Sequence, residues 1–198
     1  MQRFTLYAVA LLTMVFTSPA RSATWEIDGS HSSAQFRVTH LMISEVSGSF
    51  SQLEGKVSLE GEDITSAVVE ATIKTESLYT GSAKRDDHLK GPDFFDVEKY
   101  PDITFRSIKV TKSGDGSPEL SGQLAMHGVT RDVVLAVETL SQPQKDPWGN
   151  TRVGLTANTI IQRKDFGISW NKVLDNGGVM IGEDVKVTIH LELIKQQQ

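Results

Sequence analysis

Apolar and polar residues alternate along most of the chain after residue 23. Between 184 and 194, apolar side chains occupy every second position, and polar ones occupy the positions between them. A period of two is the signature of a β-strand with one buried face. The same alternation recurs in earlier segments, at 34–39, 69–74, 103–110, 133–137 and 153–157. We therefore predict an all-β protein.

Polar connections separate these predicted strands. Lys112 to Pro118 is rich in Gly and Ser and predicts a hairpin loop, and Pro143 to Asn150 predicts a second connection. Within 103–110 the alternation slips by one residue near Ser107, which a β-bulge would explain. Many short strands at this spacing favour a sandwich or a barrel.

One segment departs from the β pattern. Residues 82–90 contain few β-branched side chains, and the Gly91-Pro92 pair that follows would end a helix. Ser82 is a residue type that can cap a helix at its N-terminus. We predict a short helix inserted between strands, followed by a loop that carries Phe94 and Phe95.

The N-terminus has the order of a secretory signal peptide. Arg3 precedes an apolar run from Leu6 to Phe16, and Ala20-Arg21-Ser22 fits a small-x-small cleavage site. A transmembrane anchor is the alternative, but the run is shorter than the roughly 20 residues that span a bilayer. We predict a signal peptide at 1–22, export to the periplasm, and one domain over 23–198.

Composition narrows the class of protein. The sequence has no cysteine, which excludes disulfides, thiolate catalysis and cysteine metal sites. Its formal charge is −5 and becomes −7 without the two basic residues of 1–22. A chain this acidic is a poor partner for nucleic acid, and it has no basic cluster that would hold it on an anionic membrane. We expect a water-soluble protein that binds no nucleic acid and does not span the membrane.

Sequence motifs for catalysis are missing. No two of the five histidines have metal-motif spacing, and there is no G-x-S-x-G or phosphate-binding loop. We therefore predict no catalytic residues, no metal and no cofactor other than a bound lipid. A metal site made of His31, His40 and a carboxylate stays open, because only folding could bring these groups together.

Ordered motifs cover nearly the whole chain after residue 23. They include Trp25-x-x-Asp28-x-x-His31-Ser32, Phe36-x-Val38-x-His40-Leu41, Gly48-x-Phe50, Arg85-Asp86-x-His88-Leu89, Phe94-Phe95-Asp96-Val97, Tyr100-Pro101-x-Ile103-Thr104-Phe105, Gly122-x-Leu124, His127-Gly128-Val129-Thr130 and Arg163-x-Asp165-Phe166-Gly167. In this order they resemble the YceI-like family of polyisoprenoid-binding periplasmic proteins. Each motif is weak by itself, whereas the ordered series is specific.

The resemblance implies a lipocalin-like, extended antiparallel β-barrel of about eight strands with one short helix near a mouth. It also implies an isoprenoid or other long-chain amphiphile inside the barrel, and no catalysis. Phe94 and Phe95 are expected to close the mouth, and Arg163 to bind a phosphate head group. The predicted lining consists of Phe36, Val38, Phe50, Ile73, Phe105, Leu124, Met126, Leu135 and Phe166.

Three alternatives stay open at this point. Each lining residue could instead pack a dry core, which would make the protein a filled, non-enzymatic barrel for protein interaction or stress response. Trp148 would then be a contact for another protein. An enzyme acting on a bound lipid would need a group such as His31 or Asp165. A homodimer is compatible with an exposed strand edge, but the sequence indicates no interface.

Overall fold

The computed structural model describes residues 22–60, 63–175 and 177–197. The predicted signal peptide lies outside them apart from Ser22. The described strands are β1 (Ser22–Ile27), β2 (Ser33–His40), β3 (Ser44–Phe50), β4 (Leu53–Glu60), β5 (Val68–Lys74), β6 (Leu78–Tyr79), β7 (Asp102–Lys112), β8 (Pro118–Met126), β9 (Val129–Leu140), β10 (Gln144–Lys145), β11 (Thr151–Gln162) and β12 (Ile181–Lys195). The helix is α1 (Ala83–Lys90), and short 3₁₀ turns are η1 (Ile64–Ser66), η2 (Thr75–Ser77) and η3 (Arg163–Phe166).

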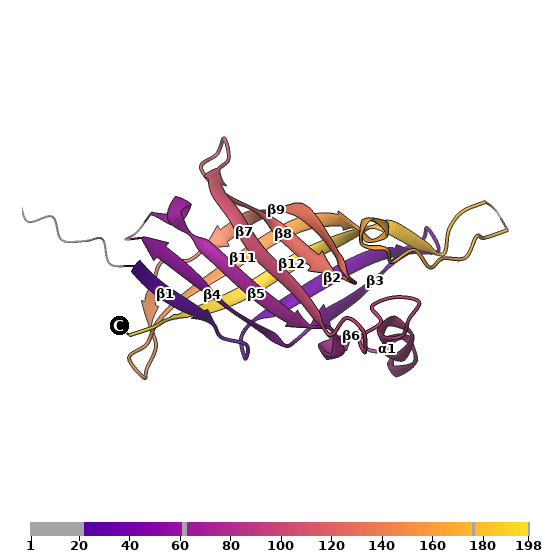
Figure 1. Cartoon of the computed structure of the whole chain (residues 1–198), viewed down its shortest axis with the longest axis horizontal. Coiled ribbons are helices and arrows are strands. Elements are labelled where there is room, and N and C mark those ends of the chain that lie inside the picture. The colour runs from indigo at the N-terminus through magenta and orange to yellow at the C-terminus, as the bar shows by residue number, and fades with distance from the viewer. Residues whose placement is uncertain (1–21, 61–62, 176, 198) are drawn as a thin grey trace, which may run out of the picture.

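Eight antiparallel strands form a closed barrel. Their order is β11-β9-β8-β7-β5-β4-β1-β12, and β12 pairs back with β11 to close the ring. Figure 1 shows the resulting elongated molecule, with β1 and the C-terminus at one end and α1 at the other. We call these the β1 end and the α1 end. The predicted all-β barrel with a single short helix is confirmed.

Strand β12 is shared by the two ends. One of its edges pairs with β11 from Asp184 to Ile194, whereas the other pairs first with β2 and then with β1. The change of partner occurs where the chain bends between β1 and β2. Two hydrogen bonds join the bend to the backbone of β12: Asp28 N–H donates to the Glu192 carbonyl, and Glu192 N–H donates to the Ser32 side-chain Oγ. Beyond β2, strands β3 and β6 extend the sheet toward α1.

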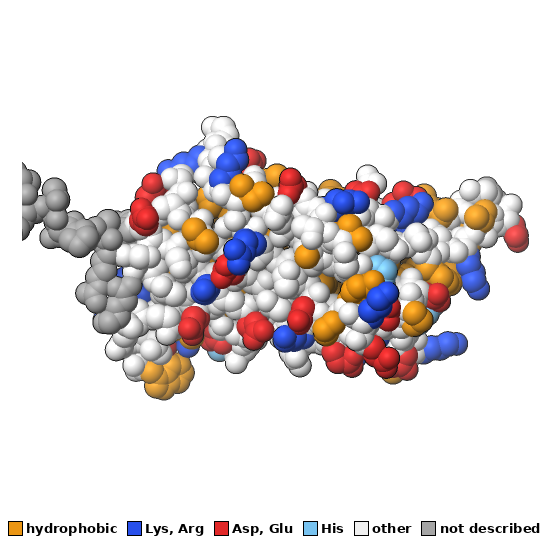
Figure 2. Space-filling view, in the orientation of Figure 1, with side chains coloured by type: hydrophobic (Ala, Val, Ile, Leu, Met, Phe, Trp, Pro, Cys, Tyr) orange, Lys and Arg blue, Asp and Glu red, His pale blue; other side chains and the backbone are white. Residues whose placement is uncertain are grey.

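The alternating pattern places the apolar face inside. Val185, Val187, Ile189, Leu191 and Leu193 of β12 all face the barrel interior. The predicted bulge is present, because the pairing of β7 with β8 shifts between Ser107 and Lys109. The extra residue, Ile108, is 61% exposed. Figure 2 shows acidic and basic side chains interspersed over the visible outer face.

The helix and one connection differ in detail from the sequence prediction. Ser82 occupies the N-cap position of α1, but its side chain makes no capping hydrogen bond. Its carbonyl instead accepts the amides of Arg85 and Asp86, as any residue type could. The Pro143–Asn150 connection contains β10, which pairs with the start of β11 and makes a small hairpin. No helix within the described part of the chain is long and apolar enough to cross a membrane.

Candidate functional site

A cavity of about 720 Å³ occupies the barrel interior. Strands at both ends contribute to it, from Ala23 and Lys195 at the β1 end to Val46 and Val185 at the α1 end. Its lining is mainly aliphatic and aromatic. The volume falls within the range of about 300–1,000 Å³ that is typical of small-molecule sites. The barrel is therefore hollow rather than packed solid.

The structure places most of the predicted ligand-binding residues on this cavity. Those that line it are Phe36, Val38, Phe50, Ile73, Phe94, Phe95, Phe105, Leu124, Met126, Leu135 and Arg163. Phe166 lies elsewhere: it is in η3, only 1% exposed, and packs in the hydrophobic core of the α1 end. Phe166 comes after β11, and the alternation of inward and outward side chains stops where η3 begins. Extending the alternation to Phe166 therefore predicted the wrong position. Contact of any of these residues with a ligand stays a prediction.

Two inward glycines allow phenyl rings to lie against the barrel wall. A Cβ built on Gly48 would lie 2.4 Å from Phe36 Cζ, and one on Gly122 would lie 2.4 Å from Phe105 Cζ. Both glycines occupy inward positions of their strands, Gly48 in β3 and Gly122 in β8. Each ring therefore fills the space that a neighbouring side chain would take. This arrangement keeps two large aromatic groups on the wall.

Arg163 lines the cavity, but its donors are directed into the protein. Its guanidinium donates to the carbonyls of Gly182, Ile168 and Trp170 at 2.9 Å each, and to that of Ile181 at 3.4 Å. The side chain is only 5% exposed, and burial lowers its pKa. This geometry supports a structural role, in which Arg163 fixes the chain after η3 to the start of β12. Binding of a head group by Arg163 remains untested.

Polar contacts also fix the helix at the α1 end. The buried carboxylate of Asp86 accepts hydrogen bonds from Thr80 N at 2.9 Å and from Thr80 Oγ1 at 2.5 Å. Arg85 lines the cavity and donates from Nε to Thr80 Oγ1 and from Nη2 to the Thr80 carbonyl. Phe94 packs against Trp170, with ring centroids 5.3 Å apart. The helix and its aromatic loop therefore cover part of this end of the barrel.

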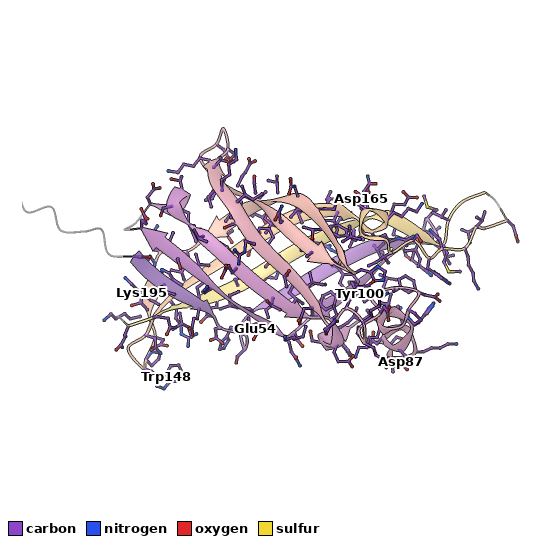
Figure 3. All side chains as sticks on the ribbon, in the orientation of Figure 1. Glu54, Asp87, Tyr100, Trp148, Asp165 and Lys195 are labelled. Atoms are coloured by element: carbon purple, nitrogen blue, oxygen red, sulfur yellow. The ribbon has the colours of Figure 1, made fainter. Side chains whose placement is uncertain are left out.

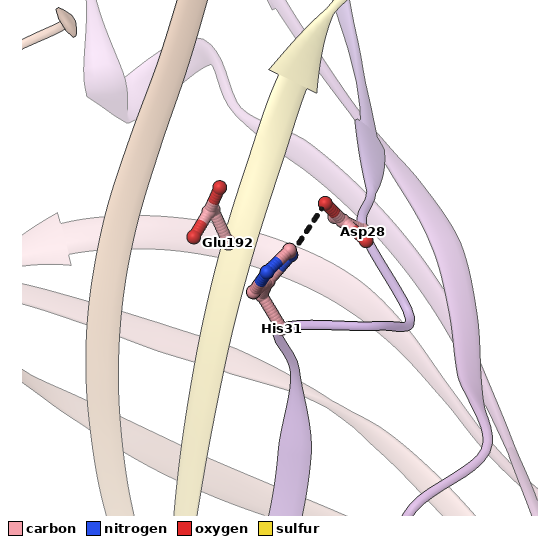
Figure 4. Close-up of side chains that lie close together, drawn as sticks. All are labelled: Asp28, His31 and Glu192. Atoms are coloured by element: carbon pink, nitrogen blue, oxygen red, sulfur yellow. Dashed lines mark hydrogen bonds and ion pairs between the residues drawn. The ribbon is translucent and has the colours of Figure 1, made fainter. Parts of the chain in front are cut away.

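A cluster of ionic groups lies at the bend between β1 and β2, and Arg152 of β11 is at its centre. Arg152 Nη1 contacts Asp28 Oδ2 at 2.6 Å and Glu192 Oε1 at 2.5 Å, and its Nε contacts Asp146 Oδ2 at 2.8 Å. His31 Nδ1 lies 2.9 Å from Asp28 Oδ2. The dashed line in Figure 4 marks this contact. Hydrogen bonds from Arg152 and His31 lower the pKa of Asp28. Burial disfavours ionised Asp146, but its hydrogen bonds with Arg152 and Asn150 prevail and lower its pKa to about 2.

This cluster is the only group among the described residues with ligand atoms close enough to hold a metal. Single ligand atoms of Asp28, His31 and Glu192 lie within 4.8 Å of one another. Because both carboxylates are already paired with Arg152, we interpret the group as an ion-pair cluster that holds the bend against β11 and β12. His40 lies at the far end of β2 and lines the cavity, so it does not join His31. Arg152 belongs to no motif in the sequence, and only the fold identifies its role.

Fold and cavity together define a class: a closed antiparallel barrel with an apolar interior large enough for a small ligand, as in lipocalins. The model of the YceI-like domain matches residues 25–193. The chain belongs to the YceI-like family.

Known proteins are similar to this chain in sequence or in fold. A UPF0312 protein of Vibrio cholerae is 37% identical over 167 residues, which cover 83% of this chain and 88% of that protein. The solved structure of the Campylobacter jejuni YceI protein has a TM-score of 0.66 and 29% identity, covering 80% of this chain and 90% of that one. A polyisoprenoid binding domain from Saccharophagus degradans shares the fold at a TM-score of 0.61 and 18% identity, covering 87% and 98% of the two chains.

Proposed function

We propose that this protein is a periplasmic binding protein that encloses an isoprenoid or other long-chain amphiphile for carriage or sequestration. The observation that carries the proposal is the apolar cavity of about 720 Å³, which extends between the two ends of the barrel. The polyisoprenoid binding domain of S. degradans, which has the same fold, supports the choice of ligand class. The periplasmic location rests on the charge and hydropathy pattern of residues 1–22.

The driving force for such binding is burial of apolar surface. Each Å² of ligand hydrocarbon removed from water is worth about 25 cal/mol, and lost ligand freedom offsets part of this gain. Methyl groups offer no directional contacts, so the tail is selected by length and width. Polar groups at the ends of the cavity would select the head group.

The two rival functions receive less support. A filled barrel would leave no interior space, whereas this barrel contains a cavity. The groups named for an enzyme acting on the lipid, His31 and Asp165, do not line the cavity. Figure 3 places Asp165 on the outer side of the barrel, in η3.

Native mass spectrometry of the protein, purified from its own host without detergent, tests the proposal. We expect a co-purified lipid, and re-uptake of a long-chain amphiphile after delipidation. Ala157→Phe would place a ring in the cavity from β11, and we expect it to abolish uptake while far-UV circular dichroism stays unchanged. Ala136→Phe is the matched control, because the exposed Ala136 of β9 pairs with Asn158, beside Ala157.

The proposal fails if the wild-type protein neither carries nor takes up a lipid. It also fails if the Ala157 and Ala136 variants take up lipid equally well.

A further inference from the structure

Two connections at the α1 end display apolar side chains to solvent. The turn between β2 and β3 carries Met42 and Ile43, which are 60% and 83% exposed. The loop before β12 (172–175 and 177–180) carries Val173, which is 78% exposed. Figure 1 shows this loop, in yellow, projecting beyond the strands at the α1 end. We call the turn and the loop together the apolar tips.

The apolar tips are ordered and joined to each other. Within the loop, Val173 and Val179 form an antiparallel bridge, and Met180 N–H donates to the Lys172 carbonyl at 2.9 Å. Leu41 N–H donates to the Met180 carbonyl at 2.7 Å, which connects the turn to the loop. Single exposed apolar residues are common on protein surfaces. Here, however, backbone hydrogen bonds hold three large ones on two connected segments at one extremity of the molecule.

The turn contains residue types that its backbone does not favour. Ile43 N–H donates to the His40 carbonyl at 3.2 Å, and both residues between them have positive φ, 52° at Leu41 and 63° at Met42. Hairpin turns of this kind favour Asn and Gly, because positive φ costs free energy in residues with larger side chains. Neither the backbone nor contact with water favours an exposed methionine here. This combination indicates that the apolar side chains themselves have a function.

The apolar tips adjoin the wall of the cavity. His40 directly precedes the turn, and Ile181 directly follows the loop. These two residues pair with each other across β2 and β12, and both line the cavity. The tips therefore continue one side of the cavity wall beyond the strands. An amphiphile taken up beside the tips would meet this wall immediately.

The small area of the tips favours a bilayer over a protein as the partner. A stable protein interface buries about 800 Å² on each partner and uses about 20–30 residues. Two narrow connections with three exposed apolar side chains provide much less. Binding to a membrane interface grows with the apolar area inserted, so a few side chains on a projecting tip are enough for transient contact. Charge plays little part, because the described residues of the tips carry one cation, Lys172, and one anion, Asp175.

We propose that the apolar tips are the surface through which the protein contacts a lipid bilayer. Met42, Ile43 and Val173 insert at the boundary between head groups and acyl chains while the protein takes up or releases its amphiphile. This inference rests on the proposed function, and it adds the surface that meets the membrane.

Single labelled cysteines locate the contact. The chain has no cysteine of its own, so Ile43→Cys can be labelled with the polarity-sensitive fluorophore nitrobenzoxadiazole. Ile160→Cys is the matched control, because Ile160 is also exposed but lies on β11 in the barrel wall. Phosphatidylcholine vesicles should shift the emission of the label at position 43 to the blue, and spin-labelled lipid should quench it. The label at position 160 should not respond, and adding phosphatidylglycerol should not strengthen the response at 43.

A double variant separates the membrane contact from folding. Met42→Gly with Ile43→Ser removes two apolar side chains and gives the turn a residue that readily adopts positive φ. We expect about a tenfold loss of vesicle binding, slower uptake of a fluorescent fatty acid from vesicles, and no loss of thermal stability. Uptake of the same fatty acid added from ethanol should not change. Trp148→Ser is the control, because Trp148 is an exposed apolar residue that Figure 3 places at the β1 end.

The inference is overturned if the label at position 43 does not respond to vesicles or responds only in the presence of phosphatidylglycerol. Loss of vesicle binding in Trp148→Ser instead of the double variant also overturns it. Dimerisation that depends on Met42 and Ile43 would assign the tips to a second copy of the chain and overturn it as well. In each case the fatty acid added from ethanol would still enter the barrel, and the proposed function would stand. Failure of the wild-type protein to take up that probe from ethanol would instead remove the proposed function.

Discussion

The two ends of the barrel are built in different ways. Around the β1 end the core consists mainly of β-branched and aliphatic side chains on strands, such as Val57, Val110 and Val153. Around the α1 end it includes Phe50, Phe94 and Phe166, and several of its residues come from segments outside the barrel strands. β-Branched side chains have restricted rotamers, so strand register fixes most of the packing at the β1 end. The packing at the α1 end depends on polar contacts that hold its non-strand segments in place.

The largest expected effect follows from removing one of those contacts. Arg163→Met removes the side-chain donor of the Gly182, Ile168 and Trp170 carbonyls at the α1 end, whereas the Ile181 carbonyl keeps its hydrogen bond from Asn171 Nδ2. Unpaired buried acceptors are costly, so we expect a loss of about 3 kcal/mol in the free energy of unfolding, measured with urea. Arg163→Lys retains the charge but not the fork of donors, and should lose nearly as much stability. Full stability of Arg163→Lys would contradict a role based on the guanidinium geometry.

A medium effect is expected from Gly48→Ala. The added methyl group would overlap the Phe36 ring and lie 2.8 Å from Thr80 Cγ2, so the ring must turn into the cavity. We expect a cost of about 1–3 kcal/mol, typical of overpacking, and weaker uptake of bulky tails. Adding Phe36→Leu should restore part of both losses. If the two substitutions were additive in stability and in uptake, the ring would not depend on the glycine.

The smallest expected effect concerns the β1 end and depends on pH. Arg152→Gln should lower the urea midpoint at neutral pH, because the ionised Asp28 and Asp146 lose their partner. In the folded protein the pKa of Asp146 is lowered from 3.8 to about 2, so its stabilising contribution is complete above pH 4 and is lost as the pH falls toward 2. The stabilities of wild type and variant should therefore converge in part over this interval, because Asp28, whose pKa Arg152 also lowers, keeps its ion pair to lower pH. A difference that stays constant from pH 7 to pH 2 would show that the ion pairs contribute nothing.

The sequence predicted the strands better than it predicted the side-chain contacts between distant segments. Strand faces follow from a local period of two, and the bulge at Ser107 followed from a local break in that period. The positions of Phe166 and Arg163 depend on η3 and on its contacts with the start of β12, which no local pattern encodes. Arg152 meets Asp28 only because β11 and β1 lie on opposite sides of β12, although 124 positions separate the two residues. Trp25 belonged to a recognised motif, but its unpaired N–H is visible only in the folded barrel.

The position of β12 in the ring has a consequence for assembly. Residues 181–195 supply the only described wall segment between β11 on one side and β1 and β2 on the other. Until β12 pairs with its neighbours, the sheet is open and has two unpaired edges. Unpaired edges favour association with other chains. Enclosure of the proposed ligand therefore requires β12 to be in place, since an open sheet would leave a hydrocarbon tail exposed to water.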